Sequence, residues 1–228
     1  MTSLATALGD VLPTALGVAL SPLPIIAIVL ILMSTKAGRT GPAFALGWVL
    51  GLTVVATVVL VVVGSGDVVF DDSASSIPSA IKLALGVVFA LLAANVWRKR
   101  PRENAPATQP GWMTKLDTAK PLFALSIGAL LSGVNPKNLA LTVTAAMAIA
   151  TAELHPTQEV VSLIVFVAIG SISFVGPVVA YLFVGERMTP VLQKLKRFME
   201  QHNTAIMLVV LSLLALSNLG KGVGGLIG

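Results

Sequence analysis

Residues 121–150 read PLFALSIGALLSGVNPKNLALTVTAAMAIA, an apolar stretch with Asn135-Pro-Lys-Asn138 at its centre. An α-helix needs about 20 apolar residues to cross the hydrocarbon core of a bilayer, so this stretch is long enough to form a membrane span. A proline inside a helix removes one backbone donor and clashes with the carbonyl four residues earlier. The stretch therefore predicts a span broken near mid-membrane, with Asn135 as N-cap of the second piece and Pro136 as its first residue.

The first apolar stretch of the chain, Val11 to Met33, has the same pattern. There Ser21 stands directly before Pro22, and Pro24 follows, again near the middle of the stretch. The residues before the two proline motifs are also alike, since LGVALS ends at Ser21 and IGALLS ends at Ser132. The first span is therefore predicted to be broken as well.

Four more stretches are long and apolar enough to be spans, namely Ala43 to Gly64, Pro78 to Trp97, Val160 to Val184 and Thr204 to Leu219. Transmembrane β-strands alternate over segments of about ten residues, and these blocks are too long and too uniformly apolar for that. Only 11% of the 228 residues are charged, where a soluble domain has about 25%. We expect an all-α integral membrane protein with six transmembrane helices, of which the first and fourth are broken.

Basic residues concentrate in alternate connections between the predicted spans. Those of the first, third and fifth connections are Lys36, Arg39, Arg98, Lys99, Arg100, Arg102, Lys115, Lys120, Arg187, Lys194, Lys196 and Arg197. The second and fourth connections contain no Lys or Arg. The positive-inside rule then makes the odd-numbered connections cytoplasmic and puts both termini outside the plasma membrane. The net charge of +5 is thus attributed to topology, and no nucleic-acid partner is expected.

The sequence lacks the usual components of a catalytic or metal site. It contains no cysteine, and its two histidines, His155 and His202, lie at the ends of segments. No Ser-His-Asp set or carboxylate pair suggests catalysis, so we expect neither an enzyme nor a cofactor. The glycine-rich residues Gly220 to Gly225 lack the spacing of a phosphate-binding loop and are interpreted as a flexible end.

Three spans precede the long basic connection and three follow it, so a repeat between the halves must have inverted topology. We divide the chain into a first three-helix repeat (1–97), a cytoplasmic basic linker (98–120) and a second repeat (121–228). The two new helix starts, at Ser21 and Asn135, should then face each other near mid-membrane, where their positive dipole ends suit an anionic group. Paired interrupted helices mark the binding site in many transporters. The alternative is that the prolines only kink packed helices.

Lys137 is the one charged residue deep inside a predicted span. An ammonium at that depth costs at least about 2.5 kcal/mol on insertion scales, so it should face a cavity and have a partner. We hypothesise that it contacts the anionic head of a transported molecule. The alternative is that it bonds only to carbonyls of the broken first span, since the prolines there free the carbonyls of Val18 and Leu20, as Pro136 frees that of Ser132.

Several motifs, taken in order, resemble one family. They are Ser21-Pro-Leu-Pro-Ile-Ile, Gly41 to Gly51, Trp112-Met, Asn135-Pro-Lys-Asn-Leu and the segment from Leu192 to His202. This set resembles the peptidoglycolipid-addressing proteins, also called Sap or sulfolipid-addressing proteins, of the lysine-exporter superfamily. The resemblance implies six helices in two inverted halves and a role in moving cell-envelope glycolipids toward the actinobacterial surface. By position, the candidate binding residues are Ser21, Pro22, Pro24, Asn135, Pro136, Lys137 and Asn138.

The leading hypothesis is therefore a transporter that exports a lipid or glycolipid, whose anionic head passes near Lys137 between the two broken helices. One alternative is a lysine-exporter-type carrier of a small amino acid or cation, although Ser21-Pro-Leu-Pro24 departs from the usual first motif of such carriers. A second alternative is a membrane scaffold that assembles with glycolipid synthases or larger lipid exporters. The pair Gly47 and Gly51 predicts close helix packing and leaves a homodimer open.

Overall fold

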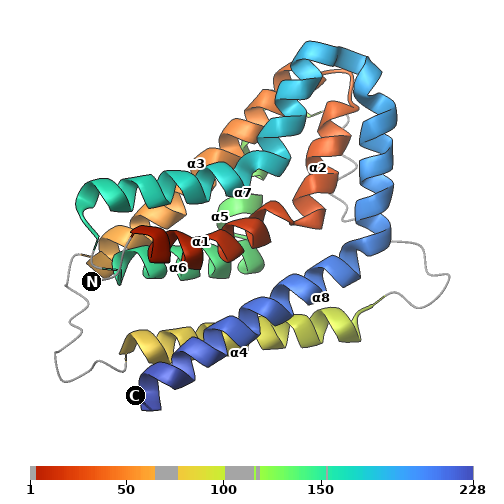
Figure 1. Cartoon of the computed structure of the whole chain (residues 1–228). Helices are drawn as coiled ribbons and strands as arrows, with labels where there is room; N and C mark the ends of the chain where they lie inside the picture. Colours follow the sequence, from red (N-terminus) through yellow and green to blue (C-terminus); the bar gives the residue numbers. More distant parts are fainter. Residues whose placement is uncertain (1–3, 65–76, 101–115, 117–118, 153, 228) are drawn as a thin grey trace.

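The computed structural model describes residues 4–64, 77–100, 116, 119–152 and 154–227. Every regular element within these ranges is helical, which confirms the all-helical prediction (Figure 1). The elements are α1 (Leu4–Ala19), α2 (Pro22–Leu32), α3 (Ala37–Gly64), α4 (Ile77–Arg98), α5 (Pro121–Gly133), α6 (Pro136–Ala150), α7 (Pro156–Val184), the short 3-10 helix η2 (Gly185–Met188) and α8 (Thr189–Ile227).

Three of the described helical stretches are long and apolar enough to cross a membrane. They are Ala37–Val63, Ser79–Arg98 and the continuous stretch Pro156–Gly225, and a fourth is obtained when α1 and α2 count as one bent span. The third stretch is not a straight rod, because α8 leaves the end of α7, bends, and runs back along α4 (Figure 1). The chain is therefore a multi-pass membrane protein by its apolar helices.

Both proline motifs interrupt a helix at the predicted position. α1 ends at Ala19 and α2 begins at Pro22, with a bend of 51° between them. α5 ends at Gly133 and α6 begins at Pro136, where the side chain of Asn135 accepts a hydrogen bond of 3.1 Å from the backbone N–H of Lys137. Asn135 is thus the N-cap of α6. Pro136 is the first residue of this helix, a position whose backbone N–H has no hydrogen-bond partner within the helix, so the missing N–H of proline does not weaken it.

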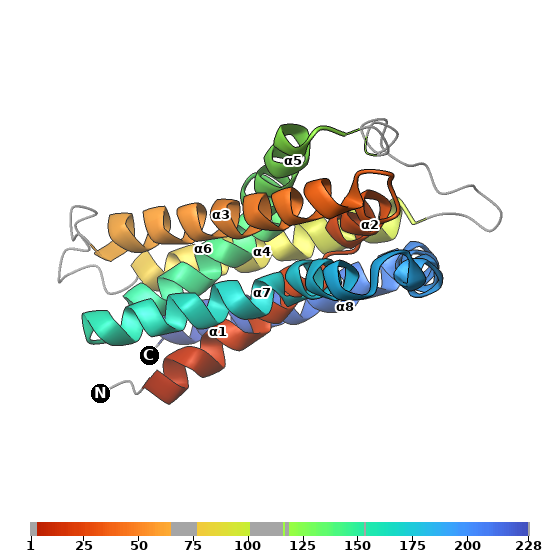
Figure 2. The same ribbon diagram turned by 90° about the horizontal axis from the view of Figure 1, so that it is seen from above.

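The described junctions between helices, apart from the two breaks, fall at two opposite ends of the bundle. Seen from above, the start of α1, the end of α8 and the junction of α6 with α7 lie at one end (Figure 2). The turn from α2 to α3 and the junction of α7 with α8 lie at the other end. Lys36 and Arg39, from the first basic connection, are exposed at this second end.

Glycines bring α3 and α5 into close contact. A Cβ added at Gly47 of α3 would lie 2.8 Å from the carbonyl carbon and 2.9 Å from the Cα of Leu125 on α5. Gly128 of α5 meets the backbone of Phe44 in the same way. The packing role predicted for Gly47 and Gly51 is therefore seen within the chain, between α3 and α5.

The expectation of a flexible C-terminal end was wrong. α8 continues as a helix to Ile227, and Gly222 and Gly225 pack against Leu83 and Ser79 of α4. Glycine disfavours helix by about 1 kcal/mol per residue, but here its missing side chain allows α8 to approach the backbone of α4. Tertiary packing thus overrides the local preference.

Replacing Gly47 by alanine is expected to destabilise the protein by about 1 to 3 kcal/mol, the usual cost of overpacking a tight contact. The matched control is Gly38→Ala on the same helix, because a Cβ there would meet nothing within 4 Å. Thermal unfolding of the purified protein in detergent should show a lower midpoint for Gly47→Ala and an unchanged or higher one for Gly38→Ala. Equal midpoints for the two variants would contradict the close contact between α3 and α5.

Candidate functional site

The two helix breaks meet inside the bundle. The hydroxyl of Ser21, just before α2, donates a hydrogen bond of 2.9 Å to Oδ1 of Asn138, in the first turn of α6. Both side chains are buried. The two proline motifs, more than a hundred residues apart in the sequence, are therefore in direct contact, and this contact is the centre of the candidate site.

Lys137 bonds across to the first broken helix. Its Nζ donates a hydrogen bond of 2.8 Å to the carbonyl oxygen of Gly17, and the residue is only 5% exposed. Gly17 lies in the last turn of α1, where carbonyls lack helical partners and the helix dipole is negative. The ammonium thus caps α1. Of the two partners predicted for Lys137, an anionic head group or a carbonyl of the broken first span, this bond is to the carbonyl.

Asn138 bonds in a similar way to a carbonyl in the last turn of α5, the helix before the second break. Its Nδ2 donates a hydrogen bond of 2.9 Å to the carbonyl oxygen of Leu131 in α5. That carbonyl is available because the N–H of Asn135, four residues on, bonds instead to the carbonyl of Leu130. One buried amide therefore joins both breaks, since it accepts from Ser21 and donates to Leu131.

Sequence reasoning identified the side chains of this cluster but not their carbonyl partners. The prolines pointed to the carbonyls of Val18 and Ser132, whereas the side chains bond to those of Gly17 and Leu131. The shift by one residue arises because α1 and α5 end at Ala19 and Gly133, before the prolines, so the helical register does not continue to them. The prediction took the carbonyl four residues before each proline, which is correct only if the helix continues up to the proline.

The other predicted residues shape the breaks without joining these contacts. Pro22 and Pro24 are buried in the first turn of α2. Asn135 is half-buried and serves as the N-cap, while Pro136 is exposed. The structure thus brings together the side chains of Ser21, Lys137 and Asn138, and leaves Pro136 on the surface of the bundle.

An apolar groove of about 690 Å³ runs between α3 and α7. Val49 and Thr53 of α3 form one wall, and residues of α7 from Leu163 to Ala180 form the other. Between the same two helices, the buried rings of Trp48 and Phe174 stack with centroids 3.7 Å apart. The groove also includes Ser171, whose buried Oγ has no hydrogen-bond partner among the described residues.

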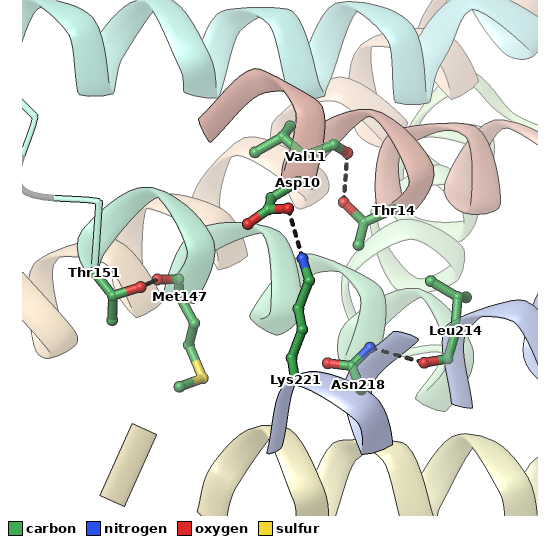
Figure 3. Close-up of polar contacts among 8 residues, drawn as sticks. All are labelled: Asp10, Val11, Thr14, Met147, Thr151, Leu214, Asn218 and Lys221. Carbon is green, nitrogen blue, oxygen red and sulfur yellow. Dashed lines mark hydrogen bonds and ion pairs between the residues drawn. The ribbon is translucent and has the colours of Figure 1, made fainter. Parts of the chain in front are cut away.

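A polar cavity of about 190 Å³ lies between α1, α4, α6 and α8. Figure 3 shows that Lys221 reaches from α8 toward Asp10 on α1, with which it forms an ion pair. Lys82 of α4 and Thr151, the C-cap of α6, also line the cavity. Sequence analysis did not single out Asp10 or Lys221, because nothing local indicates that positions 211 residues apart come together.

The helices, the two breaks and their buried contacts define a polytopic α-helical membrane protein with a polar link between two interrupted helices. The chain belongs to the Sap (sulfolipid-1-addressing protein) family, whose model matches residues 11–224. This match confirms the resemblance drawn from the motifs. The family name implies a role in addressing cell-envelope lipid and a sulfolipid substrate. Nothing in the family description indicates a catalytic function. Comparisons with curated proteins and with solved structures gave no match.

Proposed function

We propose that the protein exports an anionic cell-envelope lipid of the sulfolipid or glycolipid class toward the cell surface. The observation that carries this proposal is the apolar groove between α3 and α7, on a family background of sulfolipid addressing. A carrier of a small amino acid needs a polar cavity but no apolar groove along its membrane-spanning helices. A lipid needs both an apolar surface for its chain and polar groups for its head.

The groove suits an acyl chain. Val49, Val167 and Val175 are among the apolar side chains of its lining, which contains no charged residue. Burial of a methylene group contributes about 0.8 kcal/mol relative to water, but relative to the bilayer the gain is far smaller, so a chain in the groove can leave again. This is the property that a lipid carrier requires, because tight binding would prevent release.

The head group is proposed to pass between the two helix breaks, with Ser21, Pro22, Pro24, Asn135, Pro136, Lys137 and Asn138 as the residues that form this passage. In the structure Lys137 is held by the carbonyl of Gly17. An anionic head that enters between the breaks competes for the ammonium, because an ionised acceptor makes a stronger hydrogen bond than a neutral carbonyl. Lys137 then changes partner, and the end of α1 is released at the same moment.

The architecture proposed for this function is a pair of inverted three-helix repeats, residues 1–97 and 121–228, joined by the linker 98–120, as in the lysine-exporter superfamily. Helix contacts support it. α3 packs against α5, and its counterpart α7 packs against α1; α4 and α8, which would be equivalent, pack against each other. The positive-inside rule places both termini outside the plasma membrane, and under this topology α7 and α8 cross separately.

Filling the groove tests the lipid hypothesis. Ala168→Trp places a large ring in the exposed groove, whereas the control Leu216→Trp places the same ring on an exposed, lipid-facing position of α8. Cells that lack the gene are complemented with each variant, and lipid is extracted from the surface and from whole cells. We expect Ala168→Trp to lower the surface fraction by about tenfold, because the ring fills the space of the acyl chain, and Leu216→Trp to restore it fully.

Two results would overturn the proposal. The first is an unchanged surface lipid profile in cells that lack the protein altogether. The second is normal surface lipid with Ala168→Trp and with variants of both helix breaks, in cells that lose the lipid on deletion. That combination would favour the scaffold hypothesis, in which the protein assembles larger exporters or glycolipid synthases without carrying lipid itself.

A further inference from the structure

The polar cavity between α1, α4, α6 and α8 is lined by Lys82, an ammonium group that pairs with no carboxylate among the described residues. Lys82 is half-buried. No hydrogen bond or ion pair joins its side chain to any other residue in the described part of the chain. A charge that is partly withdrawn from water is costly unless an opposite charge compensates it. Lys82 therefore marks a place that favours an anion.

A second ammonium in the same cavity has a partner that can be displaced. Lys221 pairs with Asp10, and their side chains are 45% and 44% exposed. Ion pairs at this exposure contribute little stability, and they exchange readily with other ions. Asp10 is the one carboxylate among the described residues that line the cavity, and it occupies the position that a ligand's anionic group would take beside Lys221 (Figure 3).

The rest of the polar lining presents acceptors. The hydroxyls of Thr144 and Thr151 donate to the carbonyls of Ala140 and Met147 in their own helix, at 2.9 and 2.8 Å. The amide of Asn218 likewise donates to a carbonyl of its own helix, at 3.0 Å, which leaves its Oδ1 as an acceptor. Such a lining complements ligand hydroxyl groups, which need acceptors for their hydrogens.

We propose that this cavity binds an anionic, hydroxyl-bearing group, with Lys82 and Lys221 as its cationic partners and Asp10 as a resident competitor. The chemistry is that of a sulfated or phosphorylated head group, or of the corresponding free anion. The further role of this cavity as a binding site for the exported lipid depends on the function proposed above. It lies apart from the helix breaks, at the end of the bundle where both termini are found (Figures 1 and 2).

Charge-removing variants at Lys82 and Asp10 should have opposite effects on binding. The full-length protein is purified in a neutral detergent, and the binding of sulfated galactosylceramide and of unsulfated galactosylceramide is compared by native mass spectrometry. The wild type should prefer the sulfated lipid. Lys82→Gln should lower its affinity by about two- to fivefold, and Asp10→Asn, which frees Lys221, should raise it by a similar factor, since both changes act on partly exposed charges. The control Lys194→Gln removes an exposed lysine of α8 outside the cavity and should change nothing.

Inorganic sulfate, titrated by calorimetry, distinguishes the two sources of the anion. If the cavity responds to the charge alone, sulfate binding shows the same opposite effects of Lys82→Gln and Asp10→Asn. If the lipid head is required, these effects appear with the sulfated lipid and not with sulfate. Either pattern supports the cavity as an anion site.

The inference is overturned if Lys82→Gln binds the sulfated lipid and sulfate as the wild type does, or if Asp10→Asn weakens binding. That outcome leaves the export function untouched wherever deletion of the protein still removes lipid from the surface. Conversely, opposite shifts by Lys82→Gln and Asp10→Asn, in a protein whose deletion leaves surface lipid unchanged, would retain the anion site and refute lipid export.

Discussion

Replacement of Lys137 by methionine is expected to lower lipid export by at least about tenfold while the protein stays folded. Methionine keeps the length of the side chain but removes its charge. Loss of the bond to the carbonyl of Gly17 costs about 1 to 3 kcal/mol. Removal of a buried ammonium offsets this cost, because burying a charge carries a desolvation penalty of similar or larger size. The net change in the free energy of unfolding should therefore be small, whereas the proposed partner of the anionic head is gone.

Export and stability are measured separately for this variant. Surface lipid is quantified in cells that lack the gene and carry Lys137→Met, and thermal unfolding is followed in detergent. The control is Lys194→Met, because Lys194 is an exposed lysine of α8 whose loss should leave both quantities unchanged. Normal export by Lys137→Met would mean that Lys137 only caps α1. A large fall in the unfolding midpoint would show that the bond to Gly17 stabilises the fold more than desolvation opposes it.

Much of the fold followed from local chemistry. The breaks at Pro22 and Pro136 were predictable because proline lacks an N–H and fixes its own φ angle, whatever surrounds it. The meeting of the two breaks was also anticipated, from the order of the spans. These features depend on few residues and on rules that hold in any context. The structure has both breaks at the predicted positions, and the bond between Ser21 and Asn138, which was not predicted, joins them.

Other features depend on long-range packing and could not be predicted. Glycines at 220–225 suggest disorder by their propensity, yet Gly222 fits against the backbone of Leu83 and helps continue α8. The cavity around Lys82 is formed by four helices spread along the whole sequence, so no short motif signals it. The apolar groove is likewise formed by residues of two separate spans, α3 and α7, so no local pattern indicates it.

The contacts at the helix breaks and the polar cavity share a mechanical element, α1. One end of this short helix is held by Lys137 through Gly17, and nearer its start Asp10 pairs with Lys221 of α8. Each contact contains an ammonium for which an anion can compete. Under the proposed function, a head group that engages Lys137 releases one end of α1, and one that engages Lys221 releases the other. Successive release would allow α1 to move relative to α6 and α8 as the lipid passes.

Replacement of Asn138 by leucine should be the most destabilising single change at the helix breaks. Leucine has nearly the same size but cannot bond, so the hydroxyl of Ser21 and the carbonyl of Leu131 lose their partner together. A buried polar group left unsatisfied costs about 1 to 3 kcal/mol, so two such groups cost about 2 to 6 kcal/mol. The unfolding midpoint in detergent should fall clearly, and export should fall with it. The control is Asn95→Leu on α4, where the asparagine is exposed.

A double-mutant cycle separates the two bonds of Asn138. Ser21→Ala removes one partner, so in the presence of Asn138→Leu it should cost less than it does alone, with a coupling of about 0.5 to 3 kcal/mol between the two positions. The bond to Leu131 is unaffected by Ser21→Ala, so Asn138→Leu should remain the more severe single variant. Additive effects at Ser21 and Asn138 would contradict a direct bond between the two breaks. Coupling would instead establish that the two interrupted helices depend on each other for stability, as a passage formed between them requires.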